Sequence, residues 1–297
     1  MPKVTLLDTN ALPMEAVSRG RVNAIRRKRL PLETGIPGCT IEYSISLVPD
    51  GYFTPRHRHN FDQLRYTLTG IQSTGWGDLA PGECGYFPEG VYYGPQEQKG
   101  DCLALVLQYQ GASGEPLLSN EDMNATYQKM IASGGTFENG VYKGMTADGR
   151  PKNKDSYEAI WEEHEGRELT FPAPRYRHPI MMIGANCRWV TSRHVPGLET
   201  RHLGTFTELE TRVGYTRIAP GAAIPGERHD DMVLHYLLDG SIVYGGRVWG
   251  AGTYVYIPPG ATTETVSSTT GAEFFTLALP MVDILARQQQ GKQIAAE

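Results

Sequence analysis

An internal repeat constrains this chain more than any other feature of its sequence. Residues 51–90 align without a gap with residues 221–260, at a constant offset of 170. Identical pairs include His59 with His229 and Arg58 with Arg228, and a coincidence among glycine-rich loops does not explain them. The 297 residues therefore predict two similar domains. The other identical pairs are Gly51 with Gly221, Pro55 with Pro225, Tyr66 with Tyr236, Leu68 with Leu238, Gly70 with Gly240, Gly75 with Gly245, Gly82 with Gly252, Tyr86 with Tyr256, Pro88 with Pro258 and Gly90 with Gly260.

The predicted domains are built of short strands. The chain has 34 Gly and 20 Pro, many for a helical protein, and runs rich in Val, Ile, Tyr and Thr lie between them. This pattern is typical of a β-sandwich or barrel, and the fold class is predicted as all-β. Predicted strands are Ile41–Val48, Ala104–Tyr109, Val213–Ile218 and Phe274–Leu279.

The segment between the repeats has a different character. Residues 120–133 and 155–166 are predicted helices, the second with Asp155 as its N-terminal cap and Gly166 at its end. Residues 134–154, rich in Gly, Asn and Lys, are predicted to be irregular, and 282–290 to form a last helix. The predicted division is a first barrel with an N-terminal arm (1–119), a helical linker (120–170) and a second barrel with the terminal helix (171–297).

Composition argues against several classes of protein. The formal net charge of −5 provides no basic face, so nucleic acid is not an expected partner. Residues 1–10 lack the charged-then-apolar pattern of a signal peptide, and no apolar run approaches the length of a membrane span. The four cysteines form no CxxC pair, which favours buried thiols in a reducing compartment. We therefore expect a cytoplasmic protein without a membrane partner.

Both repeats resemble the cupin superfamily, in which two short motifs lie on a double-stranded β-helix barrel of the jelly-roll type. The resemblance implies two tandem barrels, a bicupin, and it is specific for fold but weak for function. The first cupin motif is matched by Gly51, His57, His59, Gln63 and Gly70. The second motif is matched by Gly82, Pro88 and Gly90, with Tyr93 in the place of its histidine.

The resemblance implies one divalent metal ion in the first barrel, held by His57, His59, Gln63 and Tyr93. Residues two apart on a strand share a face, so the two histidines are expected to point together into the barrel mouth. Gln63 stands where cupins usually have Glu, but its carbonyl oxygen can still ligate. Tyr93 can ligate as a phenolate, or stay neutral and act as acid, base or donor. The neighbouring Tyr92 takes this part if the turn is shifted by one residue.

His57, His59 and Gln63 donate no negative charge, so the ion keeps its full charge and its Lewis acidity rises. A bound anionic substrate, or Tyr93 as a phenolate, can restore the balance. Fe(II) is the favoured metal, with Mn, Ni or Zn as alternatives. A polar pocket without metal is the competing interpretation. Arg65 follows Gln63 by two residues and is also expected to point inward. It either binds a substrate carboxylate or forms a salt bridge, to a nearby acid such as Asp62 or to the other barrel.

The second barrel retains less of the pattern. Glu227 and His229 stand in the first motif, Val233 replaces the acid and Thr263 replaces the second-motif histidine. With His235, Glu227 and His229 form an alternative set of two histidines and one carboxylate, as in non-haem iron sites. The favoured interpretation is nevertheless a lapsed site, because fragments of motifs overstate binding sites.

The sequence thus predicts a metal-dependent bicupin enzyme that acts on a small oxygenated molecule, such as a carboxylate, with Tyr93 and Arg65 as catalytic residues. A dioxygenase-type oxidoreductase is favoured. The alternatives are a Lewis-acid isomerase, cyclase or lyase with Tyr93 or Tyr92 moving a proton, and a small-molecule-binding protein without catalysis. A storage role is disfavoured, because amide-rich low-complexity stretches are lacking. The exposed sheet edges of such barrels allow a homodimer.

Overall fold

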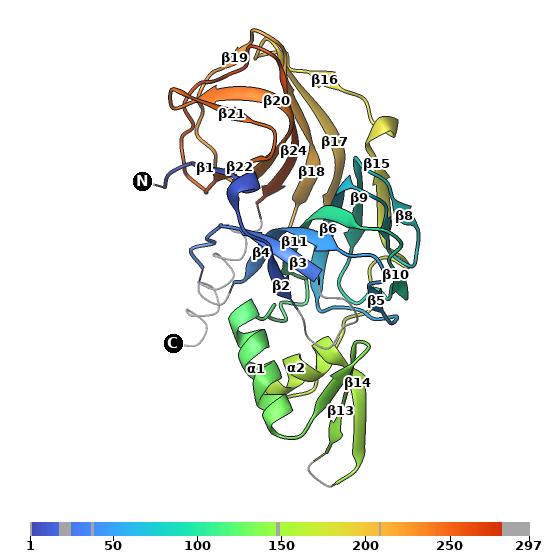
Figure 1. Cartoon of the computed structure of the whole chain (residues 1–297). Coiled ribbons are helices and arrows are strands. Elements are labelled where there is room, and N and C mark those ends of the chain that lie inside the picture. The colour runs from blue at the N-terminus through green and yellow to red at the C-terminus, as the bar shows by residue number, and fades with distance from the viewer. Residues whose placement is uncertain (1, 18–24, 37–38, 147–148, 208, 281–297) are drawn as a thin grey trace. The chain divides into compact units, whose positions relative to one another are not determined.

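Each half of the repeat folds into an antiparallel barrel, which confirms the all-β fold class (Figure 1). The structure is a computed structural model and describes residues 2–17, 25–36, 39–146, 149–207 and 209–280. The chain forms two compact units. The first barrel belongs to a unit of residues 14–29 and 38–182, and the second to a unit of residues 1–13, 30–37 and 183–297.

The two barrels repeat each other strand by strand. β4 (Ile41–Val48) and β18 (Thr211–Ile218) keep the offset of 170 at both ends, as do β9 (Glu83–Phe87) and β22 (Thr253–Ile257). The short pairs β5 (Phe53–Thr54) with β10 (Gln96–Glu97) and β19 (Ala223–Ile224) with β23 (Val266–Ser267) also correspond. The internal repeat seen in the sequence is therefore a repeat of structure.

The Pro-x-Gly turn is the same in both barrels. Gly90 N donates to the His59 carbonyl at 2.8 Å, and Gly260 N donates to the His229 carbonyl at 2.7 Å. These hydrogen bonds connect the second motif of each barrel to the segment just before the next strand, which carries His59 in the first barrel and His229 in the second. The turn thus fixes the position of the backbone that leads to Tyr93.

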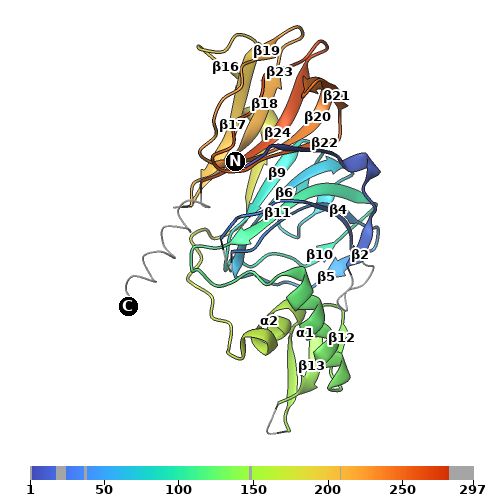
Figure 2. The same ribbon diagram turned by 90° about the vertical axis from the view of Figure 1, so that its left-hand side faces the viewer.

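In the first unit the described residues form a seven-stranded sheet, two two-stranded sheets and a three-stranded sheet within residues 136–155. β4, β6 and β11 lie side by side in both views (Figures 1 and 2). The two-stranded sheets, β5 with β10 and β7 (Gln72–Ser73) with β8 (Asp78–Leu79), lie outside it. The order of the large sheet is β15 (Ile180–Ile183), β9, β6 (Phe61–Thr69), β11 (Cys102–Gln110), β4, β3 (Ile25–Leu30) and β2 (Glu15–Val17).

In the second unit the described residues form a ten-stranded sheet around an apolar interior. Its core includes Leu237, Phe274 and Val255, all at most 7% exposed. β19, β21 (Arg247–Gly250) and β23 branch from the main path. That path is β1 (Thr5–Asp8), β22, β20 (Met232–Tyr244), β24 (Ala272–Leu279), β18, β17 (Leu198–Phe206) and β16 (Val190–Thr191). The two short 3-10 helices are η1 (Thr9–Ala11) and η2 (Gly184–Asn186).

The unit boundaries differ from those expected from the sequence. β1 belongs to the second barrel, because it pairs antiparallel with the edge strand β22. Residues 30–37 go with it, since the Tyr254 and Tyr256 hydroxyls donate to the carbonyls of Pro31 and Glu33 at 3.1 and 2.6 Å. Residues 171–182 belong to the first unit. Pairing of a sheet edge by a distant segment satisfies backbone groups in a way that local sequence does not reveal.

The linker forms a small cap at one end of the first barrel (Figures 1 and 2). The predicted helices are confirmed as α1 (Asn120–Ala132) and α2 (Ser156–Glu165), with Asp155 accepting from the amides of α2 and Gly166 left-handed at φ 67°. The prediction that residues 134–154 are irregular is wrong. The described residues form a three-stranded sheet of β12 (Thr136–Glu138), β13 (Val141–Met145) and β14 (Pro151–Asp155). Asn139 and Gly140, both with positive φ, make the two-residue turn that lets this polar segment pair between β12 and β13.

Three remaining predictions concern the termini and the cysteines. The helix predicted at 282–290 lies outside the described residues. Cys39, Cys84 and Cys102 are buried thiols, as predicted, and Cys187 is partly buried. In the described part of the chain, no helix is both long and apolar enough to span a membrane.

Candidate active site in the first barrel

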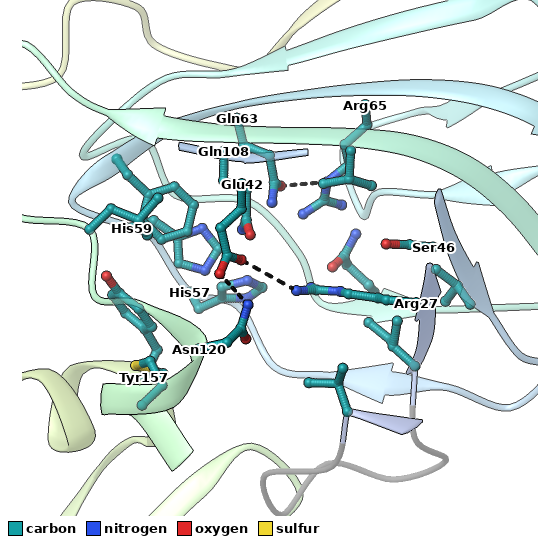
Figure 3. A pocket seen from close by; sticks show the side chains of 18 of the residues that line it. Arg27, Glu42, Ser46, His57, His59, Gln63, Arg65, Gln108, Asn120 and Tyr157 are labelled. Carbon is teal, nitrogen blue, oxygen red and sulfur yellow. Dashed lines mark hydrogen bonds and ion pairs between the residues drawn. The ribbon is translucent and has the colours of Figure 1, made fainter. Parts of the chain in front are cut away.

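A cavity of about 140 Å³ lies inside the first barrel. A water molecule occupies roughly 30 Å³ in the liquid, so the cavity can hold a ligand of several non-hydrogen atoms. Val106 and Phe61 contribute apolar wall, and Tyr157 and Asn120 reach it from the cap (Figure 3). The polar side chains that also line it are Arg27, Glu42, Ser46, His57, His59, Gln63, Arg65, Gln72, Ser73, Gln96 and Gln108.

A row of polar side chains crosses three neighbouring strands of the barrel. Gln108 on β11 is in register with Glu42 on β4 and with Gln63 on β6. Residues in register on adjacent strands face the same side, and all three line the cavity. The Gln108 amide makes no side-chain hydrogen bond to another described residue, so it can donate to and accept from a ligand.

Arg65 lies at the centre of the predicted ligand set. Its Nε donates to Gln63 Oε1 at 2.6 Å, and its Nη2 donates to the Tyr93 hydroxyl oxygen at 3.0 Å (Figure 3 shows the bond to Gln63). The guanidinium stacks over the Phe87 ring at 4.3 Å, and the residue is only 8% exposed. It makes no ion pair with an acid in the described residues, so the predicted pairing with Asp62 does not occur.

Tyr93 links Arg65 to His59. The Tyr93 hydroxyl lies 3.0 Å from His59 Nδ1, and both residues are buried. Arg65 can only donate, so the Tyr93 oxygen accepts from it. In the His59 tautomer with Nδ1 unprotonated, the Tyr93 hydroxyl donates to that nitrogen. The sequence left Tyr92 as an alternative, but Tyr92 is 42% exposed and stacks with Arg56 and Arg58 outside the cavity.

His57 is held by the backbone. Its Nδ1 lies 2.7 Å from the Pro55 carbonyl oxygen, which can only accept, so Nδ1 carries the proton in this arrangement. Nε2 is then the unprotonated nitrogen of the neutral ring. The His57 ring centroid lies 4.9 Å from that of His59 and 4.4 Å from that of Tyr93. The sequence-predicted residues of the first barrel are therefore brought together.

Glu42, Arg27 and Asn120 form a second polar group that the sequence analysis missed. Arg27 Nη1 lies 3.9 Å from Glu42 Oε2, and Asn120 Nδ2 donates to Glu42 Oε1 (Figure 3). One signal could have found Glu42, because it alternates with Ser44 and Ser46 along an otherwise apolar strand. Arg27 and Asn120 come from distant segments and carry no comparable signal.

The second-barrel candidates are more dispersed. Glu227 is 75% exposed in its side chain, and its Oε1 lies 3.9 Å from His229 Nε2. His235 Nδ1 lies 2.9 Å from Thr276 Oγ1. Burial, and then the nearby His229, lower the pKa of His235 to about 4, so it is neutral at physiological pH. Val233 packs on an apolar cluster. This geometry resembles a packed core more than a binding site.

Comparisons with known proteins agree with this fold. Residues 178–282 match the family model described as the ChrR cupin-like domain. No curated protein matches the sequence. A structure from Nostoc punctiforme, provisionally described as a dioxygenase, is 14% identical with a TM-score of 0.65 over 93% of this chain and 82% of that one.

Two further structures share the architecture. A Pseudomonas aeruginosa protein, provisionally described as glyoxylate-induced, is 11% identical with a TM-score of 0.58 over 93% of this chain and 89% of that one. Oxalate decarboxylase from Bacillus subtilis is 14% identical with a TM-score of 0.51 over 92% of this chain and 75% of that one. Another structure of that decarboxylase concerns its Mn(II) centres. The chain therefore has the two-barrel cupin fold.

The donor set of the first barrel does not fit a divalent ion in this arrangement. The described residues contain no group of three His, Cys, Asp or Glu side chains that could hold a metal. An ion bound to Gln63 Oε1 at about 2.2 Å would lie within about 4.8 Å of Arg65 Nε, which donates to the same oxygen. Repulsion between a dipositive ion and the guanidinium at that distance is about 7 kcal/mol at an effective dielectric of about 20.

Proposed function

We propose that the first barrel is the binding and catalytic site for a small oxygenated carboxylate. The observation that carries this proposal is the buried guanidinium of Arg65, which meets only neutral groups among the described residues. A buried charge is costly unless it is paired. A ligand carboxylate supplies the missing anion, and the guanidinium presents a fork that matches its geometry.

The cavity suits a small molecule with further oxygen atoms. Gln108 can bond a hydroxyl or carbonyl group, and Val106 and Phe61 exclude water on the apolar side. Within the lining the charged groups are Arg65, Arg27 and Glu42, so the cavity favours an anion over a neutral molecule.

The chemistry proposed for this chain's own residues is proton transfer. The other ring nitrogen of His59 can give a proton to the ligand as Nδ1 takes the Tyr93 hydroxyl proton, or take a proton from the ligand as Nδ1 returns it to Tyr93. Arg65 stabilises negative charge on the Tyr93 oxygen or on the ligand. His59 and Arg65 line the cavity and Tyr93 does not, so a ligand held by its carboxylate at Arg65 would meet this proton-transfer pair through His59. The proposed class is therefore an isomerase- or lyase-type reaction beside a carboxylate.

Calorimetric titration with small carboxylates and their uncharged amides tests the binding site. Glycolate with glycolamide and malonate with malonamide are suitable pairs. The carboxylates are expected to bind and the amides to fail. Arg65→Met should weaken carboxylate binding by about 30-fold or more, the cost of removing one partner of a buried charge pair. Arg56→Met, the same change at an exposed arginine of the same barrel, is the control. Equal binding by both variants would exclude Arg65 as the anchor.

Proton transfer is measured separately. Exchange of carbon-bound hydrogen of a bound carboxylate with D2O, followed by NMR, should be lost in Tyr93→Phe while binding is kept. If Tyr93→Phe changes neither exchange nor turnover of any ligand, the barrel is a binding protein without catalysis.

An Fe(II)-dependent dioxygenase, the class favoured from the sequence, is the second candidate. Two observations favour it: the fold shared with the Nostoc protein, and the orientation of His57, whose Nδ1 is bound to backbone as in many metal-ligating histidines. It requires Arg65 to leave Gln63 and Tyr93. Oxygen uptake on addition of Fe(II) and a carboxylate would support this candidate. A cytoplasmic location and a homodimer stay predictions.

A further inference from the structure

The two Arg65 bonds point to a role beyond anchoring a ligand. Arg65 donates to Gln63 Oε1 and to the Tyr93 oxygen, two of the four donors that the cupin motifs assign to a metal ion. We propose that the Arg65 guanidinium takes the place of the metal as the permanent cation of the first barrel, and that the native protein binds its ligand with this site free of metal. This inference does not depend on which carboxylate binds.

The charges around the site support this assignment. The four motif donors, His57, His59, Gln63 and Tyr93, contribute no carboxylate. Among the described residues that line the cavity, Glu42 is the one acid, and it is engaged by Arg27 and Asn120. Nothing in the described lining therefore offsets a dipositive ion added beside the guanidinium, whereas the guanidinium alone needs a single anion.

The packing of Arg65 supports it as well. The guanidinium lies over the Phe87 ring at 4.3 Å and near the Tyr93 ring at 5.1 Å, and its Nε and Nη2 are fixed by hydrogen bonds. A side chain that packs against two aromatic rings and is hydrogen-bonded through two of its nitrogens is preorganised. Such a group can stabilise an oxyanion as a metal does, through hydrogen bonds instead of coordination.

The proposal predicts that Arg65 excludes metal from an otherwise recognisable site. Arg65→Met removes the cation and releases the Gln63 and Tyr93 oxygens. Adding Gln63→Glu then supplies the acid that cupins usually have at this position. Affinity for Zn(II) or Mn(II) should rise from wild type to the double variant by on the order of 100-fold or more. Arg65→Lys keeps the charge and should stay metal-poor, which makes it the matched control.

The experiment measures metal content per chain by plasma mass spectrometry. Wild type, Arg65→Lys, Arg65→Met and Arg65→Met/Gln63→Glu are incubated anaerobically with Fe(II), Mn(II), Ni(II) or Zn(II) and then desalted. We expect metal-poor wild type and Arg65→Lys, and near-stoichiometric metal in the double variant that His57→Ala/His59→Ala removes. Circular dichroism and thermal melting identify any variant that fails to fold. The metal content of the folded variants then tests whether Arg65 excludes metal.

Two results would overturn the proposal. Near-stoichiometric metal in wild type, lost in His57→Ala/His59→Ala, would show that Arg65 and the ion coexist. A folded double variant that binds metal no better than wild type would show that Arg65 is not what excludes it. The carboxylate titrations are independent of both, so a metal-poor protein that binds no carboxylate would refute the proposed function and leave this inference standing.

Discussion

Replacing Asp62 by asparagine tests how the turn that precedes Tyr93 is supported. Asp62 is 1% exposed and accepts a hydrogen bond from Glu89 N at 2.8 Å. Glu89 lies in the turn Pro88–Gly90, whose last amide donates to the His59 carbonyl. Asparagine keeps an oxygen for the Glu89 amide but cannot ionise, so the substitution separates the bond from the charge.

The expected effect is a change in how stability depends on pH. Burial raises the pKa of Asp62 from 3.8 to about 7, with the neighbouring Glu89 charge adding a smaller increase. Because the folded-state pKa is raised, the stabilisation is fully present below pH 3.8 and is lost as the pH rises through about 7. A pKa difference of about three units corresponds to about 4 kcal/mol. Asp62→Asn should lack this loss.

Urea unfolding of both proteins measures the effect. Between about pH 4 and about pH 8, the unfolding free energy of wild type should fall by about 4 kcal/mol more than that of Asp62→Asn. Burial also raises the pKa of Glu89, which adds a pH dependence of stability to both proteins. The effect of Asp62 is therefore taken as the difference between the two pH profiles. Asp78→Asn, the same change on an exposed strand residue, controls for net charge. Parallel pH profiles for wild type and Asp62→Asn would refute the reasoning.

Three further predictions follow from the same structure. As the pH falls from 6.5 through about 4, wild type should lose about 3 kcal/mol of unfolding free energy because the buried His235 must take up a proton. His235→Leu should lack this loss, as measured by urea unfolding across that range. Gly240→Ala should cost roughly 3 kcal/mol or more, because φ is +80° and its Cβ would lie 2.0 Å from the Gly271 carbonyl oxygen. Gly250→Ala, with no atom within 4 Å, should barely change the melting temperature, and similar losses would contradict the prediction. Glu42→Gln removes the acid of the cavity and should strengthen carboxylate binding by roughly threefold to tenfold in calorimetry, whereas weaker binding would count against the charge argument.

Local sequence predicted the repeated and capped elements well. β4 begins and ends where the Ile41–Val48 run predicts, and the Asp155 cap and Gly166 end define α2. The strand pattern and the helix cap depend on contacts within a few residues, so the local sequence is enough to predict them. The three-stranded sheet at 136–155 escaped prediction because its residues are polar and glycine-rich, and its strands pair through turns instead of a hydrophobic pattern.

The sequence predicted four of the polar residues that line the cavity, but not the hydrogen bonds between them. Alternation along the strands places His57, His59, Gln63 and Arg65 on one inward face, and the structure brings all four to the cavity. The choice between Tyr92 and Tyr93 was open, since a turn shifted by one residue exchanges a buried side chain for an exposed one. The antiparallel bridge of Tyr93 to His57 decides it.

The sequence by itself determined two barrels of the same kind and a first barrel that keeps more of the cupin motif pattern than the second. Its repeat and its period of two along strands depend only on covalent order and backbone geometry. The tertiary structure alone decided that Arg65 bonds Gln63 and Tyr93 in place of an acid, that Glu42 meets Arg27 and Asn120, and that Thr5–Asp8 completes the second barrel. These contacts join segments up to about 250 residues apart in the sequence. They form only in the folded chain, where sheet edges pair and buried charges make hydrogen bonds.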